Sequence, residues 1–140
     1  MSRVFWDTNL FIYLFEEYGE SSKQVVSLRD RMFARRDILF TSTLTLGEVL
    51  VKPLEAGNQT LRKTYEDALS TQAVLVPFDH EAARIYAAIR RDRTLRAPDA
   101  IQLACAAQAQ VDLFITNDDR LSGKTIPGIQ FIASLRRAFL

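Results

Sequence analysis

The chain has 140 residues, of which 48% are hydrophobic and 25% charged, with only 5 glycines and 4 prolines. This composition is typical of one folded domain and excludes a disordered or fibrous chain. The 18 lysines and arginines balance 17 acids to leave a formal net charge of +1. The overall charge therefore gives no reason to expect a nucleic-acid partner, although a local basic patch remains compatible with it.

The counts of cysteine and histidine restrict the possible chemistry. Cys105 is the only cysteine and His80 the only histidine, which excludes an internal disulfide, a cysteine-based zinc cage and any mechanism that needs a histidine pair. No apolar run approaches the ~20 residues that cross a bilayer, and the start of the chain lacks the basic and then apolar layout of a signal peptide. We therefore expect a single cytoplasmic domain over residues 1–140.

Short apolar segments alternate with helical patterns along the whole chain. In the first half, the sequence predicts a strand at 3–6, a helix at 10–17, a helix capped by Ser21, a strand at 38–41, a helix from Thr43 that Pro53 kinks or ends, and a helix from Asn58 to about Leu69. In the second half, it predicts a strand at 73–78, a helix capped by Asp79, a helix at 98–108, and strands at 112–116 and 129–132. Strands that alternate with helices predict an α/β fold, here a three-layer α/β/α sandwich with a mostly parallel central sheet.

Four acidic residues follow predicted strands. Asp7 and Asp118 come directly after strands, and Asp99 lies in the first turn of a predicted helix. Glu48 lies in the apolar stretch LTLGEVLV, where a continuous helix would place it on a buried face. A buried carboxylate is costly unless it is paired or bound to a metal ion. Because ligands of open α/β sheets bind beyond the carboxyl ends of the strands, all four acids can converge on one edge.

Each acid also has an ordinary structural explanation. Asp7 and Asp118 alone are typical helix caps, and Asp99 alone complements the charge of a helix N-terminus. Lys52 lies four residues after Glu48 and can pair with it on a helix. The segment from Asp79 to Glu81 fits a cap and first turn better than a site.

The physics of four clustered carboxylates indicates a cation. Two carboxylates about 5 Å apart repel each other by roughly 3 kcal/mol at an effective dielectric constant near 20. Oxygen ligands are preferred by the hard ions Mg²⁺ and Mn²⁺, whereas zinc is disfavoured here because the pattern contains no histidine or thiolate set. Such an ion lowers the pKa of a bound water and neutralises charge on a phosphate, so phosphate chemistry is the natural match.

Four segments in order carry a family resemblance: VFWDTNLFIYL at the start, TLGEVL in the first third, APDAIQLACA after the middle and DLFITNDDRL near the end. With these segments the sequence resembles PIN-domain endoribonucleases, and within them the toxins of VapBC-type toxin–antitoxin pairs. The resemblance implies hydrolysis of RNA to leave a 5′-phosphate and a 3′-hydroxyl. It implies that Asp7, Asp99 and Asp118 hold Mg²⁺ or Mn²⁺, and that Glu48 positions or deprotonates the attacking water.

The same resemblance assigns supporting roles and shows departures. Asn9 matches a polar residue that supports the first acid, and Thr116 and Asn117 match a segment whose hydroxyl helps to hold the site. Gln102 stands where the family often has histidine, and Trp6 is bulkier than the usual aliphatic residue. Asp119 directly follows Asp118; the nearby threonine favours Asp118 as the ligand, with Asp119 as a cap or a supporting acid.

Substrate and partner contacts are expected elsewhere on the chain. Arginines concentrate before Pro98, and among them we expect Arg91 and Arg96 to bind RNA, the alternative being a solvated helix face. Five aromatic residues form either a thick core or an exposed patch for another chain: Phe11, Tyr13, Phe15, Tyr18 and Phe33. The resemblance implies that such a partner is a small antitoxin, and it also implies toxin homodimers.

Other function classes remain as alternatives. The first is a catalytically inactive PIN-fold module that binds RNA or protein. A phospho-accepting receiver domain is disfavoured, because it needs an acidic pair after the first strand and a late lysine after a strand, whereas Lys124 lies in a predicted loop. A metal-dependent phosphatase or a DNA nuclease would use the same ion.

Overall fold

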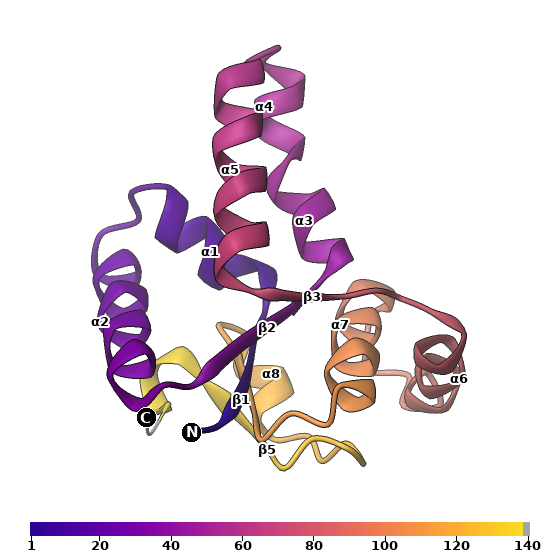
Figure 1. The fold of residues 1–140 in the computed structure, drawn as a ribbon. Helices are drawn as coiled ribbons and strands as arrows, with labels where there is room; N and C mark the ends of the chain where they lie inside the picture. The colour runs from indigo at the N-terminus through magenta and orange to yellow at the C-terminus, as the bar shows by residue number, and fades with distance from the viewer. Residues whose placement is uncertain (139–140) are drawn as a thin grey trace.

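A computed structural model describes residues 1–138 of the chain (Figure 1). Its centre is a sheet in the order β3-β2-β1-β4-β5, in which every neighbouring pair is parallel. The strands are β1 (Arg3–Trp6), β2 (Ile38–Ser42), β3 (Val74–Val76), β4 (Leu113–Thr116) and β5 (Phe131–Ser134). The chain moves outward from β1 to β3 and then returns to the other side of β1 for β4, so the strand order reverses between β1 and β4.

Helices cover both faces of the sheet, which confirms the three-layer α/β/α sandwich. They are α1 (Thr8–Phe15), α2 (Glu20–Arg35), α3 (Thr43–Val49), α4 (Val51–Glu55), α5 (Gln59–Gln72), α6 (His80–Ile89), α7 (Ala97–Gln108) and α8 (Asp119–Ser122), with a final 3-10 turn, η1 (Leu135–Arg137). Figure 1 shows α6 and α7 beside each other on one side of the sheet, α2 on the other, and α4 and α5 rising beyond its edge. None of the helices within residues 1–138 has the length and apolarity needed to span a membrane.

The alternation of side chains along β1 divides the core into two parts. Phe5 faces α6 and α7 and stacks on Phe114 of β4 with ring centroids 5.1 Å apart. Val4 and Trp6 point to the opposite face, where they pack with residues of α1, α2 and α5. Successive strand residues point to opposite faces, so the three buried residues of β1 are divided between the two cores.

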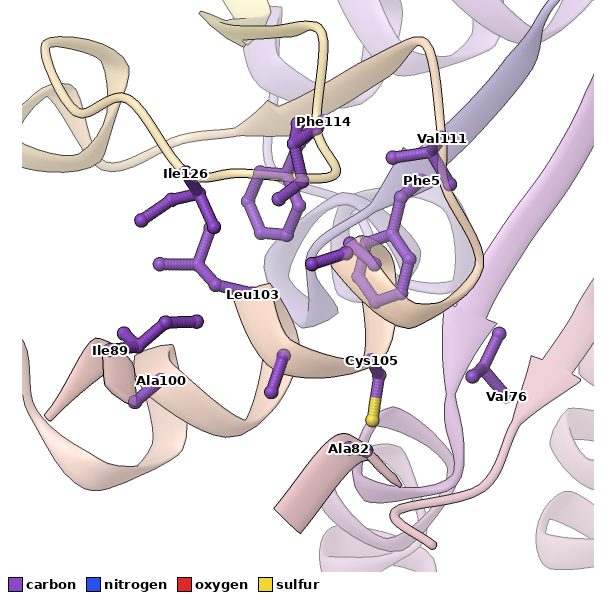
Figure 2. Close-up of a cluster of buried hydrophobic side chains, with 14 of the residues drawn as sticks. Phe5, Val76, Ala82, Ile89, Ala100, Leu103, Cys105, Val111, Phe114 and Ile126 are labelled. Atoms are coloured by element: carbon purple, nitrogen blue, oxygen red, sulfur yellow. The ribbon is translucent and has the colours of Figure 1, made fainter. Parts of the chain in front are cut away.

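Helix α7 lies close against the sheet because its buried face consists mainly of small side chains (Figure 2). The sulfur of Cys105 points toward Ala82 of α6, and burial raises the pKa of this thiol to about 12. Such a thiol is protonated at neutral pH and is a packing residue rather than a nucleophile. The turn before β5 also depends on α7: Gly128 has φ of +96°, and a Cβ there would lie 2.8 Å from the carbonyl oxygen of Ala107.

The structure corrects several predicted element boundaries. Helix α2 begins at Glu20 after Gly19, so Ser21 is not its cap. The N-cap of α3 is Ser42 rather than Thr43, whereas Asn58 and Asp79 cap α5 and α6 as predicted.

The predicted last strand at 129–132 lies two residues too early, since Ile129 is a buried loop residue and β5 is Phe131–Ser134. The helix expected from Thr43 onward breaks at Leu50, before Pro53, which occupies the first turn of α4.

Candidate active site

The four acids that follow predicted strands line one cleft of about 550 Å³. Asp7 follows β1, Glu48 lies near the end of α3, Asp99 lies in the first turn of α7, and Asp118 follows β4 as the N-cap of α8. Asp7 and Asp118 flank the point where the strand order reverses, which is the usual ligand position in open α/β sheets. The cleft is also lined by Thr8, Asn9, Ile12, Glu16, Val49, Val51, Lys52, Arg96, Pro98 and Gln102.

Asp7 is the most strongly perturbed of the four acids. Its pKa is raised to about 6, chiefly by burial and to a smaller extent by the nearby charges of Asp99 and Glu48, against two hydrogen bonds that lower it. Its Oδ1 accepts from the backbone N–H of Thr8 at 2.8 Å, and its Oδ2 accepts from the hydroxyl of Thr116 at 2.9 Å. An ionised carboxylate in this position is stabilised by a cation.

Thr116 links two of the acids. While its hydroxyl donates to Asp7, the same oxygen accepts from the backbone N–H of Asp118 at 3.0 Å. Thr116 is fully buried at the end of β4, so the first and fourth acids are held relative to each other by the central pair of strands. The Thr116 hydroxyl group thus lies between the carboxylate of Asp7 and the backbone of Asp118.

Glu48 lines the cleft and is exposed, so the prediction that it lies on a buried helix face was wrong. The break at Leu50 ends α3 early, and Val51 is 49% exposed instead of continuing a buried face. Glu48 does not pair with Lys52, whose Nζ lies 3.3 Å from Oε1 of Glu16. Instead, Oε1 of Glu48 accepts from the hydroxyl of Thr8 at 2.6 Å.

Arginines neutralise the other two acids. Nε of Arg96 lies 3.6 Å from Oδ2 of Asp99, one turn along α7. Arg120 holds Asp118 with Nε 3.0 Å from Oδ1 and Nη2 2.5 Å from Oδ2, and these bonds keep the pKa of Asp118 below its usual value. Sequence analysis missed Arg120, although its place two residues after Asp118, in the first turn of α8, was a usable signal.

The donor set fits a hard divalent cation, but the side chains are not drawn together around one. Within residues 1–138, no three acidic, histidine or cysteine side chains stand close enough to enclose an ion. The acidic side chains that line the cleft are all carboxylates, whose oxygen atoms can bind a metal ion. Burial has removed one of them, that of Asp7, from water. Oxygen donors with one uncompensated carboxylate match Mg²⁺ or Mn²⁺ better than zinc.

The sequence matches the family model of the PIN domain over residues 4–125. The chain belongs to the PIN domain family. This confirms the family resemblance drawn from the four sequence segments, and it places the cleft acids within the region that the family model matches.

Solved structures show the same PIN fold. The chain is similar to VapBC2 from Rickettsia felis, bound to a DNA fragment from its promoter, with a TM-score of 0.74 at 12% identity over 94% of this chain and 97% of that one. It is similar to DNA-bound VapBC from Salmonella typhimurium, with a TM-score of 0.69 at 21% identity over 96% and 99%. VapBC-5 from Mycobacterium tuberculosis gives 0.61 at 19% identity over 94% and 98%. A search of curated protein sequences gives no match.

The supporting residues of this PIN domain take different positions. Asn9 is exposed and lines the cleft. Asn117 does not line it; its side-chain N–H donates to the hydroxyl of Tyr13 at 2.6 Å and so fastens the end of β4 to α1. Asp119 is exposed outside the cleft and lies 3.4 Å from Arg136, so Asp118 rather than Asp119 faces the site.

The two arginines predicted to bind RNA also lie in different places relative to the cleft. Arg96 lines the cleft, whereas Arg91 lies exposed in the turn after α6 and is not part of the lining. Lys52 is a cleft cation that sequence analysis assigned only as a possible partner of Glu48. Lys52 lies in α4, the separate helix that begins after the break at Leu50.

Proposed function

We propose that this PIN domain is a metal-dependent endoribonuclease and the toxin of a toxin–antitoxin pair. The observation that carries the proposal is the convergence of four carboxylates, from four separate parts of the chain, on one cleft at the strand-order reversal of a PIN fold. Nuclease activity is general in this family. Metal dependence, RNA as the substrate and the toxin role are our proposals.

The proposed roles of the acids follow from their surroundings. Asp7, Asp99 and Asp118 would hold Mg²⁺ or Mn²⁺, which supplies charge neutralisation at the scissile phosphate and a more acidic water. Glu48, more exposed than Asp7 and oriented by the Thr8 hydroxyl, would accept the proton of the attacking water. Asn9 stands at the cleft wall and would orient either the first acid or the substrate.

RNA would be held by cations of the cleft. Arg96 and Lys52 line it, and their side chains are 68% and 70% exposed, so both can reach a phosphate. Arg91 would contact RNA only outside the cleft. We expect Arg96→Ala to weaken RNA binding strongly at low salt and Arg91→Ala to weaken it less, because arginine–phosphate contacts are screened by salt.

The central test is cleavage of RNA by the purified protein. We expect Mn²⁺ or Mg²⁺ to support cleavage that leaves 5′-phosphate ends, EDTA to abolish it, and Asp7→Asn, Asp99→Asn and Glu48→Gln each to reduce it at least a hundredfold. Asp67→Asn removes an exposed acid of α5, paired with Lys63 outside the cleft, and serves as the control. Cleavage by Asp7→Asn or Asp99→Asn at the wild-type rate would show that the acids have been assigned wrongly.

An inactive binding module remains the alternative function. It predicts RNA or protein binding without cleavage under any metal condition, and growth arrest on expression that Asp7→Asn does not relieve. The endoribonuclease predicts that the same substitution abolishes both cleavage and growth arrest. Cleavage of a single-stranded DNA of the same sequence is measured in parallel. Cleavage of both strands would indicate a general nuclease, and cleavage of RNA alone a ribonuclease.

The proposed protein partners are a small antitoxin and a second copy of the chain. The similar structures from Rickettsia felis, Salmonella typhimurium and Mycobacterium tuberculosis are VapBC systems, which supports the first proposal. Of the five aromatic residues noted in the sequence, Phe11 is buried while Tyr18 and Phe33 are 45% and 86% exposed. Light scattering on the purified chain tests the homodimer, and co-expression with the neighbouring reading frame tests the antitoxin. We also propose that the protein acts in the cytoplasm.

A further inference from the structure

A cluster of uncharged polar side chains lies buried beneath the acidic cleft. It consists of Thr8, Thr41, Ser42, Thr45 and Gln102, which we call the Gln102 network. Each member is at most 7% exposed, and Gln102 itself is 2% exposed. Buried polar groups are costly unless their hydrogen bonds are satisfied, so the contacts of this network decide whether it stabilises one arrangement.

The amide of Gln102 uses both of its ends. Its Nε2 donates to the hydroxyl oxygen of Thr8 at 2.9 Å and to that of Thr45 at 2.8 Å. Its Oε1 accepts from the hydroxyl of Ser42 at 2.5 Å. Thr41 contacts Thr45 at 2.8 Å and the carbonyl of Trp6 at 2.9 Å. The network is therefore hydrogen-bonded throughout.

The contact with Glu48 determines which way the amide faces. A carboxylate only accepts hydrogen bonds, so the single hydroxyl proton of Thr8 points to Oε1 of Glu48 at 2.6 Å. The oxygen of Thr8 must then accept its other bond, which requires Nε2 of Gln102 on that side. The opposite amide orientation would place two oxygens against each other with no proton between them.

The network also joins the segments that carry three of the acids. Thr8 follows Asp7, Gln102 lies one turn after Asp99 on α7, and Thr45 lies one turn before Glu48 on α3. One neutral side chain on α7 is thus hydrogen-bonded to the start of α1 and to α3, which lie in distant parts of the sequence. A neutral amide fits this position because it adds no charge beside a carboxylate-rich cleft.

We propose that Gln102 is a positioning residue that directs the Thr8 hydroxyl and thereby fixes the orientation of the Glu48 carboxylate. The catalytic meaning of this orientation rests on the proposed function, in which Glu48 accepts the proton of the attacking water. The geometric part, that Gln102 acts on Glu48 through Thr8, stands without it. Gln102 acts through another residue and is not itself a catalytic group.

The first test compares variants that keep shape and remove hydrogen bonds. Gln102→Met and Thr8→Val are close in volume to the native side chains, and Thr8→Ser restores the hydroxyl. Gln108→Met is the matched control, since Gln108 lies on the same helix and its amide donates to Asp79, outside the cleft, at 2.7 Å. Each variant is first measured by urea denaturation, so that rates refer to folded protein.

We expect single-turnover RNA cleavage at saturating Mn²⁺ to fall by about 10- to 100-fold in Gln102→Met and Thr8→Val, as is typical when a partner that orients a site residue is removed. The KM for RNA should stay unchanged, Thr8→Ser should recover most of the rate, and Gln108→Met should match wild type. Wild-type rates in the folded Gln102→Met and Thr8→Val proteins would reduce the network to packing and overturn the proposal.

A second readout is independent of activity. The ¹³C resonance of the Glu48 carboxyl carbon should shift in both Gln102→Met and Thr8→Val, return toward its wild-type position in Thr8→Ser, and stay unchanged in Gln108→Met. If the wild-type protein cleaves no RNA, the proposed function fails while this experiment still tests the positioning. An unchanged Glu48 resonance in both apolar variants would refute the positioning even in an active nuclease.

Discussion

Removing the charge of Asp7 should stabilise the metal-free protein, and only at pH values where the carboxyl group is ionised. The pKa of Asp7 is raised from 3.8 to about 6, chiefly by burial. A shift of about two units corresponds to roughly 3 kcal/mol between the two protonation states. The folded protein binds the Asp7 proton more tightly than the unfolded chain does. The loss of stability caused by ionising Asp7 is therefore absent below about pH 4 and complete above about pH 6.

The substitution Asp7→Asn isolates this cost because asparagine has nearly the same shape and does not titrate. Its side-chain oxygen can still accept from the N–H of Thr8, and its amide can donate to the oxygen of Thr116, so the change in hydrogen bonding is a pH-independent offset of about 1 kcal/mol. The variant should therefore exceed wild type in unfolding free energy by about 3 kcal/mol more at pH 7.5 than at pH 4. Acids outside the cleft keep the same surroundings in both proteins, so their contributions cancel in the difference.

The assay is urea denaturation in EDTA, followed by the fluorescence of Trp6. This is the only tryptophan, it is fully buried, and it directly precedes Asp7. Asp119→Asn, which removes an exposed acid outside the cleft, is the control for the loss of a carboxylate. A difference between Asp7→Asn and wild type that is the same at both pH values would refute the desolvation of Asp7. Added Mn²⁺ should then stabilise wild type at pH 7.5 more than the variant.

Three further predictions concern the surroundings of the cleft. Arg120→Gln should tighten Mn²⁺ binding by about two- to fivefold in calorimetry, because an exposed ion pair to Asp118 competes only weakly with the ion; weaker binding would show that Arg120 supports the site. Lys52→Ala should leave the urea midpoint almost unchanged but reduce the slope of log affinity for RNA against log salt by about 0.7, the value for one lost phosphate contact. Gly128→Ala should lower the unfolding free energy by about 2 kcal/mol or more, since its φ of +96° and the 2.8 Å approach to Ala107 both oppose a side chain, and a stable variant would show that the turn can move.

The sequence predicted the elements and the acids at the sheet edge because both depend on local signals. Apolar strands, cap residues such as Asp79 and the position of Asp7 directly after β1 are visible within a few residues of the chain. Parallel strands then bring their carboxyl ends to one edge, so the convergence of the acids followed from the fold class. The failures arose where the helix differed from the expected pattern: Thr45 and Val49 form the buried face of α3, Glu48 is exposed, and Lys52 pairs with Glu16.

The Gln102 network could not have been predicted in the same way. Gln102 and Thr8 are 94 positions apart, and nothing in the local sequence of α7 indicates that a glutamine there points into the base of a cleft. Its neighbours are alanine, leucine and cysteine, which predict a buried face and therefore make a glutamine look misplaced. Contacts of this kind depend on how helices from distant segments pack, and only the folded structure supplies that information.

The near-neutral net charge of the chain includes acids and arginines that lie close together around the cleft. Two of the carboxylates beside Asp7 have an arginine near them: Arg96 lies by Asp99 and Arg120 by Asp118. Within residues 1–138, Asp7 forms no ion pair with a basic side chain, and burial raises its pKa. A divalent ion bound near Asp7 would therefore relieve the largest electrostatic cost and compete with the two arginines for their acids. The arginines released in this way would stand beside the ion, where the phosphates of an RNA strand need positive charge, so metal binding and substrate binding should reinforce each other.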